Sequence, residues 1–171
     1  MDSIESFGTG GVCDRELGLV ELENLQSLPP SLTITGPHFA CLVLCDAHEV
    51  DAKAIGDFAE SLLVQGAVYV CAWGPDCERV HDIFDEETVG GGPDIPRFSD
   101  GVMTTGHHDK GLDDALFYLL VCTYPDDEFF DTCRSALVIS VGNTGWAERA
   151  REALTKPSEF VRKVSSCRGP S

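Results

Sequence analysis

The segment that decides the fold is Phe39-Ala-Cys-Leu-Val-Leu-Cys45, a continuous apolar run that ends at Asp46. A short apolar run of this kind indicates a strand buried on both faces, as in the centre of a parallel sheet. Ala67-Val-Tyr-Val-Cys-Ala-Trp73 repeats the pattern. Residues 101–105 and 136–141 complete a set of four predicted strands.

Helical periodicity separates these strands. After the first strand, five apolar residues recur at the spacing of one helix face: Ile55, Phe58, Ala59, Leu62 and Leu63. Asp51 is the predicted N-cap of this helix, and Gly66 is predicted to follow its last turn. Further helices are expected after Pro75, over residues 112–120 and over residues 146–154.

Strands that alternate with helices predict an α/β domain. We expect a small three-layer sandwich, Rossmann-like or flavodoxin-like, around a four-stranded and mainly parallel sheet. Right-handed crossovers leave few strand orders. The order expected from edge to edge is 67–73, 39–45, 101–105 and 136–141.

The expected single domain spans residues 38–154. Residues 1–37 are acidic and contain a Pro-Pro pair, which predicts a loosely ordered lead-in with a short strand near residues 32–34. Residues 155–171 are basic and rich in serine, which predicts a frayed tail. Residues 126–135 fit either a short helix or an acidic loop.

Charge excludes some partners. The 171 residues include 29 acidic and 12 basic side chains, for a formal net charge of −17. Nucleic acids and anionic membranes are themselves polyanions, so neither is an expected partner. The longest apolar runs fall far short of the ~20 residues that cross a bilayer.

Cysteine usage and the start of the chain predict the compartment. The first eleven residues lack the basic and apolar regions of a secretory signal. Four of the eight cysteines lie within apolar segments, and no pair has C-x-x-C spacing. These features predict a reduced, cytoplasmic protein without a zinc site.

The fold predicts where a ligand would bind. In open α/β sheets, ligands bind beyond the carboxyl ends of the strands, near the point where strand order reverses. The residues expected to line such a site follow the four predicted strands: Asp46, Trp73, Gly74, Asp76, Thr105 and Asn143.

Cys77 is the candidate nucleophile of a catalytic version of this site. It falls in the first turn of a predicted helix, where partial positive charge lowers a thiol pKa. His81, one turn further on, or His107 is the candidate base. Asp76 and Glu78 flank the thiol and oppose its activation. The alternative role of Cys77 is structural, as a half-buried cysteine packed beneath a tryptophan.

The sequence predicts neither a metal site nor a phosphate-binding loop. His107, His108 and Asp109 could ligate a metal ion together with Asp46, but adjacent histidines point in different directions, so no metal site is predicted. The glycine run within residues 88–100 lacks the lysine and serine or threonine of a P-loop, which predicts an ordinary loop. No cofactor is expected.

The acidic surface supports a second class of function. Residues 1–154 hold 28 acidic and 8 basic side chains. Such a surface can dock on a basic protein partner, and electrostatic complementarity would speed that association. The alternative to a small-molecule or catalytic crevice is therefore a non-enzymatic acidic binding protein of the immunity, antitoxin or regulatory kind.

Several segments together resemble a family of small bacterial proteins that carry a domain of unknown function. They include His38-Phe-Ala-Cys-Leu-Val-Leu-Cys-Asp46, Val102-Met-Thr-Thr105, Asp131-Thr-Cys-Arg-Ser135 and Ser140-Val-Gly-Asn143. The most distinctive piece is Cys71-Ala-Trp-Gly-Pro-Asp-Cys77. The likeness spans about residues 38–154. It implies a bacterial origin and one compact α/β domain, and it implies no catalytic residue.

Overall fold

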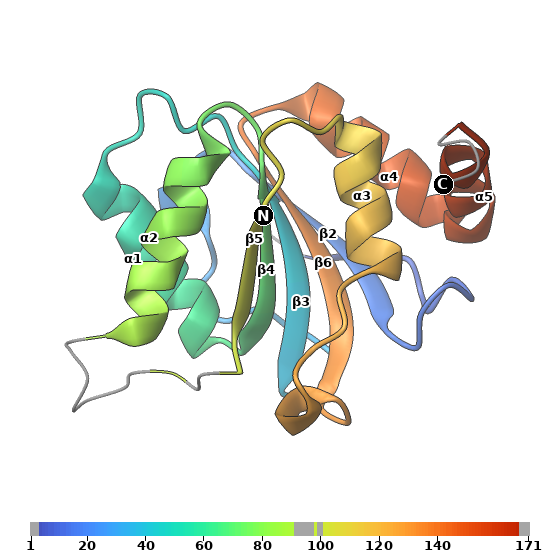
Figure 1. Cartoon of the computed structure of the whole chain (residues 1–171), viewed down its shortest axis with the longest axis horizontal. Coiled ribbons are helices and arrows are strands. Elements are labelled where there is room, and N and C mark those ends of the chain that lie inside the picture. The colour runs from blue at the N-terminus through green and yellow to red at the C-terminus, as the bar shows by residue number, and fades with distance from the viewer. Residues whose placement is uncertain (1–3, 91–97, 99–100, 168–171) are drawn as a thin grey trace.

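The computed structural model describes residues 4–90, 98 and 101–167 and contains one sheet in the order β1-β2-β6-β3-β4-β5 (Figure 1). Its strands are β1 (Glu5–Ser6), β2 (Glu16–Leu22), β3 (His38–Leu44), β4 (Ala67–Trp73), β5 (Met103–Gly106) and β6 (Cys133–Val141). β1 pairs antiparallel with β2, and all other neighbours pair in parallel. The predicted α/β class is confirmed, with a mixed sheet of six strands rather than four.

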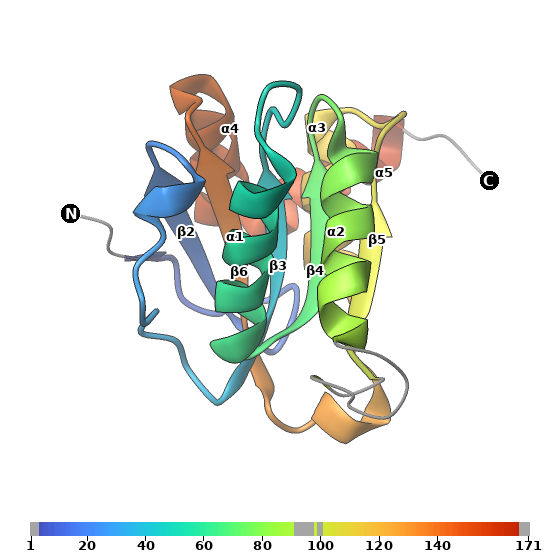
Figure 2. The ribbon, with the colours of Figure 1, turned by 90° about the vertical axis from the view of Figure 1, so that its left-hand side faces the viewer.

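Helices cover both faces of the sheet (Figures 1 and 2). The helices are η1 (Leu25–Ser27), α1 (Ala52–Val64), α2 (Cys77–Val89), α3 (Leu112–Val121), η2 (Asp127–Phe129), α4 (Thr144–Thr155) and α5 (Pro157–Cys167). One buried cluster joins the sheet to α1, α2 and η1, and a second joins it to α3, α4 and α5. The expected helices are all present.

Local signals explain where these helices begin and end. The Asp51 side chain accepts a hydrogen bond from Ala54 N at 2.8 Å and caps α1, as predicted. Gly66 has φ +112°, and a Cβ there would lie 2.2 Å from Pro37 O. Only glycine fits that position. Asn143 caps α4 by accepting from Trp146 N at 3.0 Å.

The predicted strand order is wrong. Residues 136–141 form part of β6 and lie between β2 and β3, whereas residues 101–105 contribute to the edge strand β5. Polarity accounts for the difference. Every residue of β6 except Arg134 is buried, but Met103 is exposed and the threonines that follow it are only half-buried. The more apolar strand occupies the interior of the sheet.

Both ends of the described chain contain more structure than predicted. β2 lies within the expected lead-in and pairs with β6, so loose order is the wrong description of residues 16–22. Residues 32–34 form no strand. α5 lies within the expected tail and buries Phe160. Residues 126–135 contain the short helix η2 and the start of β6.

Two further predictions concern the loop at 88–100 and membrane crossing. α2 extends through Val89, and most of the predicted loop (residues 91–97, 99 and 100) lies outside the described residues. Within the part of the chain that the structure describes, no helix combines the length and apolar character needed to cross a bilayer.

Candidate functional site

The segments that follow β3, β4, β5 and β6 gather at one edge of the molecule, at the top of Figures 1 and 2. This follows from parallel pairing, which directs the carboxyl ends of these strands the same way. The predicted site residues therefore lie near the carboxyl ends of the strands. Their detailed positions divide them into those that line a pocket and those that do not.

The loop between β4 and α2 has a tightly constrained backbone. Gly74 has φ +124°, and a Cβ there would lie 2.2 Å from Cys45 O. Backbone hydrogen bonds join Cys45 N to Trp73 O at 3.1 Å and Ala47 N to Pro75 O at 3.0 Å. Glycine at position 74 thus allows the β4 loop to approach the end of β3 closely.

A pocket of about 430 Å³ opens beside this loop. Its lining residues come from the end of β4, the β4–α2 loop, the first turn of α2, the β5–α3 loop and the first turn of α4: Trp73, Gly74, Pro75, Asp76, Cys77, Glu78, His108, Lys110 and Trp146. The volume falls within the range of small-molecule sites. Four of the predicted site residues are therefore part of one concave surface.

Trp73 and Trp146 form the aromatic part of the pocket. Their ring centroids are 5.2 Å apart, and the ring planes are inclined by 81° in an edge-to-face arrangement. Trp73 Nε1 donates to Lys110 O at 2.8 Å, which fixes its indole ring. The polar group of the Trp73 indole ring is thus satisfied within the protein.

The charged part of the pocket is mainly acidic. Asp76 adopts left-handed backbone angles, with φ 60°, and its side chain makes no helix-capping hydrogen bond. Its carboxylate is 3.8 Å from the Arg79 guanidinium. Glu78 pairs with His108 Nδ1 at 3.1 Å, and the other nitrogen of that ring lies 3.1 Å from Asp109.

Cys77 lies at the start of α2, as predicted, but its side chain is buried and 1% exposed. Burial raises the pKa of the Cys77 thiol, by more than the nearby backbone groups of His107 and Gly74 lower it. Among the described contacts, no hydrogen bond joins its sulfur to the ring of His81 or His107. Burial therefore disfavours the thiolate form of Cys77.

The two candidate bases have other partners. His81 lies at the surface of α2, with Nδ1 3.3 Å from Asp82 and Nε2 3.6 Å from Asp85. His107 is buried under α3, where Nε2 lies 2.9 Å from Thr105 Oγ1 and the ring packs edge-on against Tyr118. Burial lowers the pKa of His107, and Lys110 and His81 lower it further.

The remaining predicted site residues lie outside the pocket lining. Asp46 is exposed and accepts a hydrogen bond from His48 N at 3.1 Å. The Thr105 hydroxyl is committed to His107, and the Asn143 side chain caps α4. These three residues shape neighbouring loops and the helix start rather than the pocket wall.

Five lining residues were not among the site residues predicted from the sequence: Pro75, Glu78, His108, Lys110 and Trp146. The sequence position of Trp146 indicated that it lies near the site. It begins a helix directly after the last predicted strand, at the same sheet edge as Trp73. The contact between these tryptophans depends on the true strand order, because β6 lies beside β3 and the first turn of α4 then reaches the end of β4.

No three histidine, cysteine, aspartate or glutamate side chains group into a metal site within residues 4–90, 98 and 101–167. The two histidines considered as metal ligands, His107 and His108, have different surroundings. The His107 ring is buried against Tyr118, whereas His108 is exposed and pairs with Glu78.

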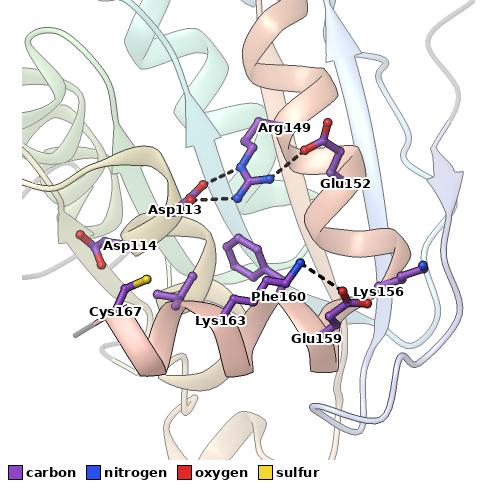
Figure 3. A pocket seen from close by; sticks show the side chains of 10 residues that line it. Asp113, Asp114, Arg149, Glu152, Lys156, Glu159, Phe160, Lys163 and Cys167 are labelled. Atoms are coloured by element: carbon purple, nitrogen blue, oxygen red, sulfur yellow. Dashed lines mark hydrogen bonds and ion pairs between the residues drawn. The ribbon is translucent and has the colours of Figure 1, made fainter. Parts of the chain in front are cut away.

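A larger cavity of about 660 Å³ lies elsewhere, between α3, α4 and α5 (Figure 3). Arg149 binds Asp113 through two hydrogen bonds of 2.7 and 2.8 Å and also binds Glu152. Its guanidinium lies 5.4 Å from the ring centroid of Phe160. Since the Arg149–Asp113 pair joins α4 to α3 and Phe160 of α5 packs against Arg149, we interpret this cavity as part of the packing of these three helices.

The fold and pocket define a class: an α/β domain with an aromatic, acidic pocket at the carboxyl edge of a mainly parallel sheet. The chain belongs to the family described as Domain of unknown function (DUF7684), which matches residues 17–157. The match includes β2, which the predicted domain at 38–154 omits. Comparison with curated proteins and with solved structures gives no match.

Proposed function

We propose that this protein binds a small organic molecule, without catalysis, in the pocket between Trp73 and Trp146. The observation that carries the proposal is a 430 Å³ pocket with two indole rings at the carboxyl edge of the sheet. Small-molecule sites in open α/β folds recur at this edge, and they combine apolar and aromatic walls with a few polar groups.

The backbone beside the pocket gives further support. Asp76 is the one non-glycine residue with positive φ in the described chain. Unusual backbone angles concentrate at ligand sites, where the surrounding structure maintains them. The buried thiol of Cys77 argues for binding rather than nucleophilic chemistry.

Intrinsic fluorescence tests this function directly, because Trp73 and Trp146 are the only tryptophans in the sequence. We expect a subset of a panel of small organic amines, acids and uncharged aromatics to change the emission saturably. Trp146→Leu should abolish that binding. Phe130→Leu, which alters an exposed aromatic residue near the start of β6, should leave it unchanged.

Two outcomes would count against small-molecule binding. One is a panel in which no compound changes the emission. The other is binding that survives Trp146→Leu undiminished, which would locate the ligand elsewhere.

A second candidate function is docking on a basic protein partner, and the surface of α2 favours it. Its Asp82, Asp85 and Glu86 are exposed. Arg79, the one arginine of α2, which has no lysine, donates to Ala47 O at 2.8 Å and Val50 O at 2.5 Å. The helix therefore presents carboxylates to solvent without a neighbouring arginine or lysine of its own.

Capture of partners from a native lysate at low and high salt would test docking. We expect a salt-sensitive basic partner that the triple variant Asp82→Asn, Asp85→Asn, Glu86→Gln no longer captures. Equal capture by that variant would exclude α2 as the docking surface.

We also propose that the protein is bacterial and cytoplasmic, that its sheet is Rossmann-like and that it does not bind nucleic acid. All eight cysteines are free, as in a reducing compartment. In the order β5-β4-β3-β6, β4 and β5 lie on one side of β3 and β6 lies on the other, as around the switch point of Rossmann-like sheets. The net charge of −17 disfavours a polyanionic partner.

A further inference from the structure

The two indole rings of the pocket form the walls of a corner. Their planes are inclined by 81° with centroids 5.2 Å apart, so the edge of one ring lies against the face of the other. A group placed in the angle beside this contact would meet the face of one ring and the uncovered part of the other ring's face. Indole faces carry the negative part of the ring quadrupole. Aromatic corners and cages of this kind recognise methylated and quaternary ammonium groups.

The carboxylates of the pocket also favour a positively charged ligand. Asp76 is uncommitted as a helix cap, and its nearest cation, Arg79, is held by the backbone carbonyl oxygens of the β3–α1 loop. Glu78 shares His108 with Asp109. Lys110 is the opposing charge in the lining. Carboxylates therefore outnumber ammonium groups around the indole corner.

The whole molecule adds to this preference. A formal net charge of −17 produces a negative potential that concentrates cations near the surface and repels anions. The α2 N-terminus would favour an anion, but Asp76 and Glu78 already provide negative charge at that position. An organic anion would therefore meet two carboxylates beside the rings.

We propose that the pocket recognises a small organic cation bearing a quaternary or methylated ammonium group, which extends the proposed binding function and rests on it. The methyl groups contact the faces of Trp73 and Trp146. The carboxylates of Asp76 and Glu78 balance the positive charge. Recognition is by binding alone, with no bond made or broken.

The test is a fluorescence titration of the full chain with choline and with 3,3-dimethyl-1-butanol, its uncharged isostere. The two compounds have nearly the same shape, so the ratio of their affinities reports the positive charge. We expect choline to bind about fivefold or more tightly than the isostere. Sodium acetate, as the anionic probe, should not bind.

Three substitutions locate the effect. Asp76→Asn should weaken choline binding severalfold and leave the isostere unchanged. Lys110→Gln should tighten choline binding, a gain that cannot come from damage to the fold. Asp57→Asn removes a carboxylate from α1, where Asp57 pairs with Lys53, and should change neither affinity.

The outcomes distinguish recognition of an organic cation from small-molecule binding in general. Equal affinity for choline and the isostere, or unchanged choline binding in both Asp76→Asn and Lys110→Gln, overturns the cation proposal while small-molecule binding stands. Failure of choline and of every compound in the broader panel overturns the binding function itself.

Discussion

Gly74 connects the end of β4 to the pocket through a backbone conformation that only glycine adopts easily. Its position against Cys45 O leaves no room for a side chain. We expect Gly74→Ala to reduce the free energy of unfolding by at least about 2 kcal/mol, because it combines backbone strain with a clash. Urea denaturation measures the change.

Gly56→Ala is the matched control for this substitution. Gly56 lies within α1, and an added methyl group meets the end of the Glu87 side chain at 3.3 Å rather than backbone. A change within about 1 kcal/mol is expected, since alanine favours helix. A Gly74→Ala variant as stable as Gly56→Ala would contradict the close approach of the β3 and β4 loops.

Cys77 is expected to react slowly with thiol reagents in the native protein. Burial raises its pKa and shields the sulfur, whereas Cys167 is exposed. Mass spectrometry after brief alkylation near neutral pH should find label on Cys167 well before Cys77, and Cys167→Ser should remove the fast phase. Preferential labelling of Cys77 would reinstate a nucleophilic role.

His107 gives stability a predictable pH dependence. Burial lowers its pKa from the usual 6.5, so the unfolded chain binds this proton more tightly than the folded chain. The stabilisation that His107 contributes is fully present above about pH 6.5. It is lost as the pH falls toward the lowered pKa of His107 in the folded state. Urea denaturation at about pH 7.5 and 5.5 should show His107→Gln losing less stability than wild type.

His48→Gln serves as the control for that comparison, because His48 is exposed. The control should retain the wild-type loss of stability over the same interval. An unchanged pH dependence in His107→Gln would show that His107 is not a buried neutral group.

Two buried side chains anchor α5, Pro157 and the larger Phe160. Phe160 is 6% exposed, and it packs with α3 and α4 beside the Arg149–Asp113 pair (Figure 3). Phe160→Ala should lower the free energy of unfolding by about 3 kcal/mol, from lost burial and the cavity left behind. Ser165→Ala, on the exposed side of α5, should have little effect. Equal stability of the two variants would mean that α5 is detached in solution.

Elements with continuous apolar runs or clear helical spacing could be predicted from sequence, as β3, β4 and α1 illustrate. β2 was missed because Gly18 and flanking glutamates interrupt its apolar pattern. The glycine is explained only by tertiary structure, since a Cβ at position 18 would lie 2.6 Å from Ile4 Cγ2. α5 was missed because its apolar face is narrow, although Pro157 at its first position is a helix-start signal.

At the scale of the whole molecule, sequence could place the site at the carboxyl edge but not choose among the residues there. Parallel topology brings Asp46 and Trp73 to the same edge, yet only Trp73 faces the pocket. That choice depends on strand order, which sets β6 beside β3 and brings Trp146 to Trp73. Short-range patterns do not encode which crossover a chain takes.

The proposed ligand site is the Trp73–Trp146 pocket. Amide and indole NMR chemical shifts of the full chain during a choline titration test it most directly. Choline binding in this pocket should give saturable shifts at both indole N–H groups and at the amides of residues 74, 76–78 and 108–110. Shifts confined to the cavity between α3, α4 and α5, or to the exposed acidic surface of α2, would contradict it.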